Sequence, residues 1–150
     1  MYFGTGVHVN DLKDAKEYPP VYKIQYTVTG AQRKVKDKSK CVQTGIKVDV
    51  NGHTLALFRF DRTLYAILNK CPHQGGPLAS GDVIDIEDAH SQVVSCPYHG
   101  WKFNLKTGAC DRDDDIVQPV YPVKVIRGGE IAVGFRSIST NLFDQSCADF

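Results

Sequence analysis

The sequence predicts a mainly β protein, and three features support this prediction. Short runs of residues alternate between apolar and polar side chains, which is the period of a half-buried strand. Two-residue turn signals, Asn51-Gly52 and Asp61-Arg62, directly follow such runs. Helical periodicity is weak everywhere, and only Asp11–Tyr18 offers a turn or two of helix.

The expected strands can be placed in chain order. Residues 21–28 (VYKIQYTV) alternate apolar and polar side chains and predict a half-buried strand. Asn-Gly tolerates positive φ at both positions, so a meander of antiparallel strands is expected around it. Its strands are Ile46–Val50, His53–Phe60 and Thr63–Leu68. Later strands are expected at Gln92–Ser95, Trp101–Leu105, Val123–Ile126 and Glu130–Phe135.

Length and composition limit the class of protein. A chain of 150 residues, 42% of them hydrophobic, predicts one compact domain over residues 1–150. Its 18 basic and 17 acidic residues leave a net charge of +1, which offers no broad basic face for nucleic acid or anionic lipid. No apolar run reaches the roughly 20 residues that cross a bilayer, so no membrane span is expected. The start lacks signal-peptide features, which predicts a cytoplasmic protein; a transit peptide removed ahead of Met1 would instead indicate an organelle.

Two charged stretches have two interpretations each. Gly30–Lys40 is rich in lysine and arginine and poor in apolar residues, whereas Asp111–Asp115 is an acidic run. The simpler interpretation of both is a solvated, exposed loop. The alternative is an electrostatic docking patch for a partner protein, and both interpretations stand.

Two short loops combine cysteine with histidine. The first is Cys71–Pro77 (CPHQGGP), with C-x-H spacing, and the second is Cys96–Trp101 (CPYHGW), with C-x-x-H spacing. Their glycines and prolines suit tight loops in which backbone N–H groups approach a bulky ligand. With five cysteines and no export signal, a metal explains these residues better than disulfides. The remaining cysteines, expected to be plain thiols, are Cys41, Cys110 and Cys147.

These loops closely resemble those of the Rieske iron–sulfur family. The resemblance implies one 2Fe–2S cluster per chain, with two cysteines on one iron and two histidines on the other. The matching residues are Cys71, Cys96, His73 and His99. The resemblance covers residues 46–134 and implies an antiparallel β-sandwich base with a small cluster-binding lobe at about residues 69–104. A structural zinc ion on the same side chains is the alternative, although zinc fingers usually pair cysteine with cysteine within a loop.

The resemblance also implies a low reduction potential. Rieske proteins of cytochrome bc complexes carry a disulfide between the two loops, and the matching positions here are Gly76 and Tyr98. Those relatives also donate hydrogen bonds to sulfur from a serine and a tyrosine, where this chain has Trp101 and Phe103. Fewer donors make the added electron less favourable, so we expect the lower part of the family range of about −150 to +300 mV.

The implied function is transfer of one electron at a time rather than catalysis by the chain alone. The favoured interpretation is a ferredoxin-like carrier between a reductase and an oxygenase or another acceptor. The alternatives are an electron-transfer subunit of a larger oxidoreductase complex and a non-redox module with a structural metal. The chain has no histidine after His99, so it cannot form the two-histidine, one-carboxylate iron site that oxygenases carry in a second domain.

Overall fold

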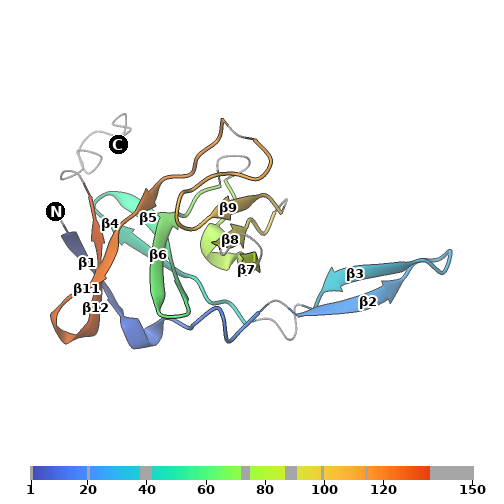
Figure 1. The fold of residues 1–150 in the computed structure, drawn as a ribbon, viewed down its shortest axis with the longest axis horizontal. Coiled ribbons are helices and arrows are strands. Elements are labelled where there is room, and N and C mark those ends of the chain that lie inside the picture. The colour runs from blue at the N-terminus through green and yellow to red at the C-terminus, as the bar shows by residue number, and fades with distance from the viewer. Residues whose placement is uncertain are drawn as a thin grey trace.

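In the computed structural model, the regular structure of the described residues consists mainly of antiparallel strands joined by turns (Figure 1). The structure describes residues 2–19, 21–37, 42–71, 75–86, 91–98, 100–113 and 115–135. Within these ranges the helical segments are short 3₁₀ turns: η1 Val9–Asp11, η2 Leu78–Ser80 and η4 Arg127–Gly129. The mainly β class is therefore confirmed. The turn or two of helix expected over Asp11–Tyr18 is wrong, because these residues form only the end of η1 and an isolated turn. No helix among the described residues has the length and apolar character that a bilayer crossing needs.

The central sheet has four strands in the order β10-β6-β5-β4. Its members are β4 Ile46–Val50, β5 His53–Phe60, β6 Thr63–Leu68 and β10 Val120–Tyr121. The first three coincide with the predicted meander, whereas the two residues of β10 are too few to show a pattern. Asn51 and Gly52 have φ values of 52° and 78°, which is the backbone of the expected two-residue hairpin turn.

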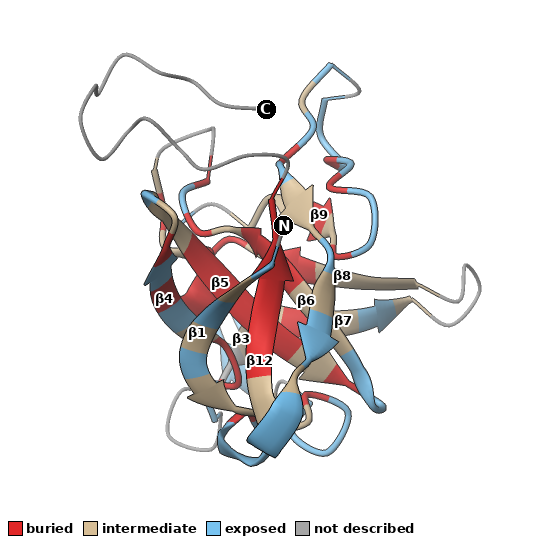
Figure 2. Cartoon of the chain, turned by 90° about the vertical axis from the view of Figure 1, so that its left-hand side faces the viewer, coloured by how far each residue is buried: buried red, intermediate tan, exposed pale blue. Residues whose placement is uncertain are grey.

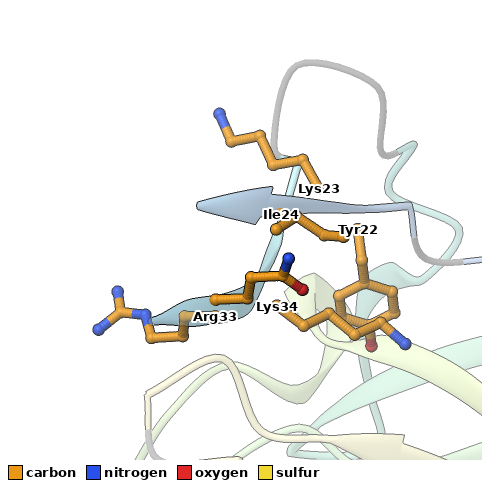
Figure 3. A pocket seen from close by; sticks show the side chains of 6 residues that line it. Tyr22, Lys23, Ile24, Arg33 and Lys34 are labelled. Atoms are coloured by element: carbon orange, nitrogen blue, oxygen red, sulfur yellow. The ribbon is translucent and has the colours of Figure 1, made fainter. Parts of the chain in front are cut away.

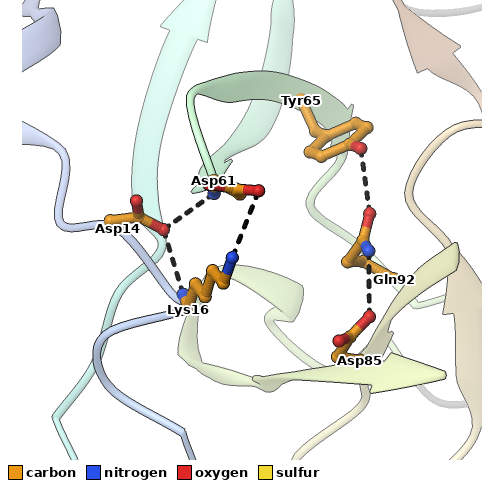
Figure 4. Close-up of polar contacts among 6 residues, drawn as sticks. All are labelled: Asp14, Lys16, Asp61, Tyr65, Asp85 and Gln92. Carbon is orange, nitrogen blue, oxygen red and sulfur yellow. Dashed lines mark hydrogen bonds and ion pairs between the residues drawn. The ribbon is translucent and has the colours of Figure 1, made fainter. Parts of the chain in front are cut away.

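The turn between β5 and β6 uses a similar backbone without glycine. Asp61 and Arg62 have φ values of 48° and 72°, a region that residues with a Cβ adopt at an energetic cost. Asp14 Oδ1 accepts the N–H of Asp61 at 2.9 Å, and Lys16 pairs with the Asp61 carboxylate at 3.2 Å (Figure 4). Contacts from a distant part of the sequence therefore help to hold this turn.

A second sheet, in the order β1-β12-β11, packs against one face of the central sheet. It consists of β1 Tyr2–His8, β11 Val123–Val125 and β12 Glu130–Gly134. β11 and β12 lie where strands were predicted, and they pair as an antiparallel hairpin with Val123 opposite Val133. β1 was not predicted, because Gly4 and Gly6 interrupt its apolar alternation.

A third sheet, in the order β7-β8-β9, flanks the second Cys/His loop. It consists of β7 Asp82–Ile86, β8 Ser91–Ser95 and β9 Lys102–Asn104. β8 and β9 lie where strands were expected, but β7 was missed, since its two aspartates are uncommon in strands. Ser95 lies opposite Lys102, so residues 96–101 form the connection of a β8–β9 hairpin.

β5 is largely buried and separates two hydrophobic cores (Figure 2). Phe58 and Phe60 enter the first core, whereas Leu55 and Leu57 enter the second, which β12 completes. Side chains alternate across a strand, so this nearly continuous apolar run is typical of a strand covered on both sides. The first core extends to both Cys/His loops. The division into a base and a lobe over residues 69–104 stays a prediction, since β5 and the loops share this core.

Two strands project from the rest of the molecule as a separate hairpin, called here the β2–β3 arm (Figure 1). They are β2 Tyr22–Tyr26 and β3 Gln32–Lys36. The expected first strand is present, but its half-buried character is wrong, because every residue of β2 is exposed. The exposed loop expected over Gly30–Lys40 is wrong where β3 forms; residues 38–40 lie outside the described ranges. β3 is stabilised by pairing with β2 rather than by burial. Its lysine-rich sequence therefore lacks the apolar alternation that predicts a strand.

Candidate metal centre

The two Cys/His loops leave the ends of strands and bring their cysteines into the first core. Cys96 directly follows β8, and Cys71 comes shortly after β6. Both thiols are buried, with exposed fractions of 3% for Cys96 and 1% for Cys71. They share their core with Phe58 and Phe103, which are fully buried. The structure therefore places both predicted cysteine ligands in one water-poor environment.

The first loop closes through two backbone hydrogen bonds. The Cys71 N–H donates to the Gly76 carbonyl at 2.9 Å. The Gly75 N–H donates back to the Cys71 carbonyl at 2.7 Å. The cysteine is thus held at both its N–H and its carbonyl, which fixes the direction in which its side chain leaves the loop.

The second loop repeats this pattern at the same spacing. The Cys96 N–H donates to the Trp101 carbonyl at 2.7 Å, and the Gly100 N–H donates to the Cys96 carbonyl at 2.9 Å. The glycine four positions after each cysteine has a positive φ, 71° at Gly75 and 73° at Gly100. This left-handed backbone favours glycine, which explains one glycine in each motif. The two loops therefore share these hydrogen bonds and a positive-φ glycine, although their sequences differ.

Gly76 marks the point where the two loops meet. A Cβ added there would lie 2.7 Å from Cys96 Sγ and 3.2 Å and 3.3 Å from two ring atoms of Tyr98. Such close approach is not tolerated, so the absence of a side chain lets the loops pack together. Gly76 and Tyr98 are also the positions matched above to the disulfide of the bc-complex relatives, and the structure places them side by side.

Two buried amide side chains hold the base of the first loop. Gln118 is 2% exposed, and its amide donates to the carbonyls of Leu68 and Lys70 at 2.7 Å each. Asn69 is 8% exposed, and its side-chain oxygen accepts the N–H of Ala79 at 2.8 Å. These residues were not predicted, because a lone amide in an apolar stretch is only a weak signal for a buried polar support.

An exposed carboxylate supports the second loop. The Lys102 N–H donates to Asp111 Oδ1 at 2.9 Å, and the Asp111 N–H donates back to the Lys102 carbonyl at 3.0 Å. Asp111, Asp113 and Asp115 are all exposed, which agrees with a solvated loop for the acidic run. Asp114 lies outside the described ranges. The acidic run therefore has a structural role at its first residue.

The two predicted imidazole ligands, His73 and His99, lie outside the described residues, so their ligation stays a prediction. Within the described ranges, no three metal-ligating side chains form a group. The structure thus reports on the cysteine half of the predicted ligand set, and it brings that half together in one core.

A third cysteine joins the same core. Cys110 is 7% exposed and is a free thiol, as expected, and its Sγ accepts the N–H of Arg112 at 3.4 Å. Its place in this core was not predicted, because Cys110 lies far from both motifs in the sequence. Cys41 and Cys147 lie outside the described residues.

Hydrogen bonds join the central sheet to the third sheet near the candidate site (Figure 4). The Tyr65 hydroxyl donates to Gln92 Oε1 at 3.1 Å, and Gln92 Nε2 donates to Asp85 Oδ1 at 3.0 Å. Burial raises the pKa of Tyr65 above its ordinary value, and a hydrogen bond with Thr63 partly offsets this effect. Tyr65 is therefore a neutral donor at physiological pH.

The described residues fit an iron–sulfur cluster. Two buried thiols stand on loops with the same backbone hydrogen bonds, and Gly76 lets these loops pack together at Cys96 Sγ. Cysteine thiolates are the ligands that such clusters use. A tetrahedral zinc ion would use the same two thiols. Comparison with known proteins bears on this choice.

The comparisons favour the cluster. Residues 25–126 match the family model described as Rieske [2Fe-2S] domain. A stretch of 58 residues is 40% identical to the carnitine monooxygenase oxygenase subunit of Escherichia coli (strain K12). That stretch is 38% of this chain and 14% of the relative, so the chain spans a small part of that protein.

Solved structures show the same fold. One is the ferredoxin of carbazole 1,9a-dioxygenase from Nocardioides aromaticivorans IC177, with a TM-score of 0.56 and 22% identity over 89% of this chain and 97% of that one. Another is the NAD(P)H nitrite reductase small subunit from Erwinia carotovora, with a TM-score of 0.57 and 17% identity over 93% of this chain and 86% of that one.

Proposed function

Because the chain belongs to the Rieske family, whose cofactor is a 2Fe–2S cluster, we propose that it is a one-electron carrier. The proposed ligands are Cys71, His73, Cys96 and His99. The observation that supports them most directly is the pair of buried thiols on loops with the same backbone hydrogen bonds. A bound Rieske cluster supplies reversible uptake of a single electron.

The surrounding residues prepare the site for this task. Phe58 and Phe103 exclude water from the two thiols, and a dry surrounding influences the potential of a metal site. The paired hydrogen bonds of each loop fix the cysteine backbones. A site fixed in this way changes shape little between its oxidised and reduced states.

We infer that the chain passes electrons from a reductase to an oxygenase or another acceptor. Support comes from the likeness in fold to a protein named as the ferredoxin of a dioxygenase, 97% of which is covered. The likeness to a nitrite reductase small subunit supports a second candidate, an electron-transfer subunit of a larger oxidoreductase. Gel filtration with each class of partner separates the two, since a carrier dissociates readily and a subunit stays bound.

Electron paramagnetic resonance of the dithionite-reduced protein tests the proposal. We expect a Rieske-type signal with a low average g value, which reports mixed cysteine and histidine ligation. His73→Ala and His99→Ala should each abolish that signal, whereas His90→Ala, a control outside both motifs, should retain it. A colourless, silent protein with stoichiometric zinc, or ligand variants with the wild-type signal, would overturn the proposal.

A redox titration tests the proposed low potential. The midpoint should lie in the lower part of the family range, and a value above about +150 mV would contradict it. Phe103→Tyr adds a hydroxyl beside the thiol core and should raise the midpoint, because a donor to sulfur stabilises the reduced state. Phe58→Tyr, in the same core, is the matched control for the added hydroxyl.

A further inference from the structure

The β2–β3 arm contributes no described residue to either hydrophobic core. Tyr22, Ile24 and Tyr26 alternate along β2 and are 43%, 60% and 69% exposed. An isolated two-stranded hairpin is only marginally stable in water. Large apolar side chains on a projecting ribbon therefore indicate a surface that gains stability from contact with another molecule.

The strand register determines which side chains of the arm share a face. Lys34 lies opposite Ile24, and Gln32 lies opposite Tyr26. Directly opposed residues point to the same side of a sheet, so apolar and polar side chains are interleaved on this face. The Lys34 ammonium also lies 4.5 Å from the centroid of the Tyr22 ring (Figure 3).

A shallow hollow of about 360 Å³ lies along the arm (Figure 3). Its lining combines two large apolar side chains with three cations. The lining residues are Tyr22, Lys23, Ile24, Gln32, Arg33 and Lys34. Such a surface can receive an apolar side chain whose neighbours are carboxylates.

The charged side chains of the β2–β3 arm all carry positive charge. Residues 21–36 hold four basic residues and no acidic residue, in a chain whose net charge is +1. Among the described residues, the ion pair that forms is Lys16 with Asp61, outside the arm. The arm cations Lys23, Arg33 and Lys34 are therefore available to acidic groups of another molecule.

We propose that the β2–β3 arm docks an acidic protein surface. Tyr22, Ile24 and Tyr26 are its apolar anchors, and Lys34 on the same face pairs with carboxylates. Lys23 and Arg33 lie on the opposite face and add to the attraction of an acidic surface. Tyrosine and arginine are enriched where protein interfaces are strongest, and complementary charge speeds association. The choice of a protein as occupant rests on the proposed carrier function, because a carrier must meet other redox proteins.

Anionic lipid and single-stranded nucleic acid fit the arm less well than an acidic protein surface. Insertion into anionic lipid requires separate apolar and basic faces, whereas here Lys34 lies beside Ile24 on one face. Single-stranded nucleic acid stacks its bases on open aromatic rings, but the Lys34 ammonium occupies one face of Tyr22. The two five-residue strands, about 17 Å long, form a contact smaller than a permanent interface needs. Binding should therefore be transient and sensitive to salt.

The test compares three probes on the full chain with its cluster. They are poly-L-glutamate, an oligothymidylate strand, and phosphatidylcholine vesicles with one quarter phosphatidylserine. We expect poly-L-glutamate to bind more tightly than the other two, with an affinity that falls as salt rises. Tighter binding of the strand or the vesicles would overturn the proposal in favour of nucleic acid or lipid.

Variants locate the binding surface. Arg33→Glu with Lys34→Glu should weaken binding of poly-L-glutamate by about tenfold, since two contacts become repulsive. A matched control reverses two exposed lysines outside the arm, Lys47→Glu with Lys106→Glu, and should bind like the wild type within about twofold. Equal losses in the two double variants would overturn the proposal, because they would indicate general charge rather than the arm.

Two further measurements separate this proposal from others. Sedimentation at several concentrations should show a monomer; a dimer that Arg33→Glu with Lys34→Glu dissolves would assign the arm to a second copy and overturn the acidic partner. The arm variants should keep the wild-type paramagnetic signal. If the wild type itself lacks that signal while binding at the arm persists, the carrier function fails and the docking surface stands.

Discussion

The two Cys/His loops share two backbone hydrogen bonds and a glycine of positive φ, but they differ in the residue five positions after each cysteine. That residue is Gly76 in the first loop and Trp101 in the second, and its carbonyl accepts the cysteine N–H in both. Gly76 has no side chain because Cys96 Sγ and Tyr98 lie against it. Trp101 instead packs against the first core. The first loop therefore has a glycine where the second loop packs against it, whereas the second loop has an aromatic side chain packed on the core.

The loops also differ in what supports them. The buried amides of Asn69 and Gln118 hold the first loop, whereas the exposed Asp111 holds the second. A buried group that loses its partner cannot turn to water, while an exposed one can. The first loop therefore depends more strongly on single side chains.

The largest expected effect comes from adding a side chain at Gly76, where the two loops meet. Gly76→Ala places a methyl group against Cys96 Sγ and should cause loss of most of the iron and of the paramagnetic signal. Gly100→Ala is the matched control, because Gly100 has a positive φ but no atom of the described residues lies within 4 Å of the added Cβ. It should keep the iron and lose about 1 kcal/mol of unfolding free energy. Iron analysis checks both variants, and full iron content in Gly76→Ala would show that the close contact at Gly76 is not needed for the site.

A second prediction compares the two supports. Gln118→Ala leaves the carbonyls of Leu68 and Lys70 without their donor and should lower the unfolding free energy by about 3 kcal/mol. Asp111→Ala removes an exposed bond and should lower it by no more than about 1 kcal/mol. Urea denaturation measures both. Equal losses would show that burial does not distinguish the loops.

The smallest effect concerns the strand that leads to the second loop. Tyr65→Phe removes the bond to Gln92 of β8 and should cost about 1 kcal/mol at neutral pH. Folding raises the Tyr65 pKa, so this contribution is complete below the usual value of about 10 and is lost as pH rises through the raised pKa. The variant should lack one alkaline-shifted step in a tyrosinate absorbance titration. Identical titration curves for variant and wild type would contradict this.

Local signals explain how much of this fold the sequence predicted. β4, β5 and β6 matched their predicted bounds, because apolar patterns and the turns at Asn51-Gly52 and Asp61-Arg62 lie next to each other in the chain. The motif cysteines Cys71 and Cys96 were identified from the spacing within each motif and from the family resemblance, and both lie in one core. These features depend on residues that are neighbours in sequence.

Features that depend on distant contacts were missed. Gln118 supports a loop about fifty residues away. Neither its amide nor its neighbours in the sequence form a pattern that predicts this contact. β3 is held by pairing with β2, so its lysines suggested a loop. The exposure of β2 was missed because alternation predicts two faces but not whether a second layer covers one of them.

Burial of the loop cysteines also affects how a cluster is inserted and how fast the thiols are oxidised. Cys71 and Cys96, the proposed ligands, are 1% and 3% exposed, so a donor of iron and sulfide would reach them only while this part of the fold is open. Delivery therefore competes with completion of folding in a newly made chain. Once closed, the same packing slows oxidation of the thiols to sulfenic acid, so the lifetime of the centre follows the rate of local opening.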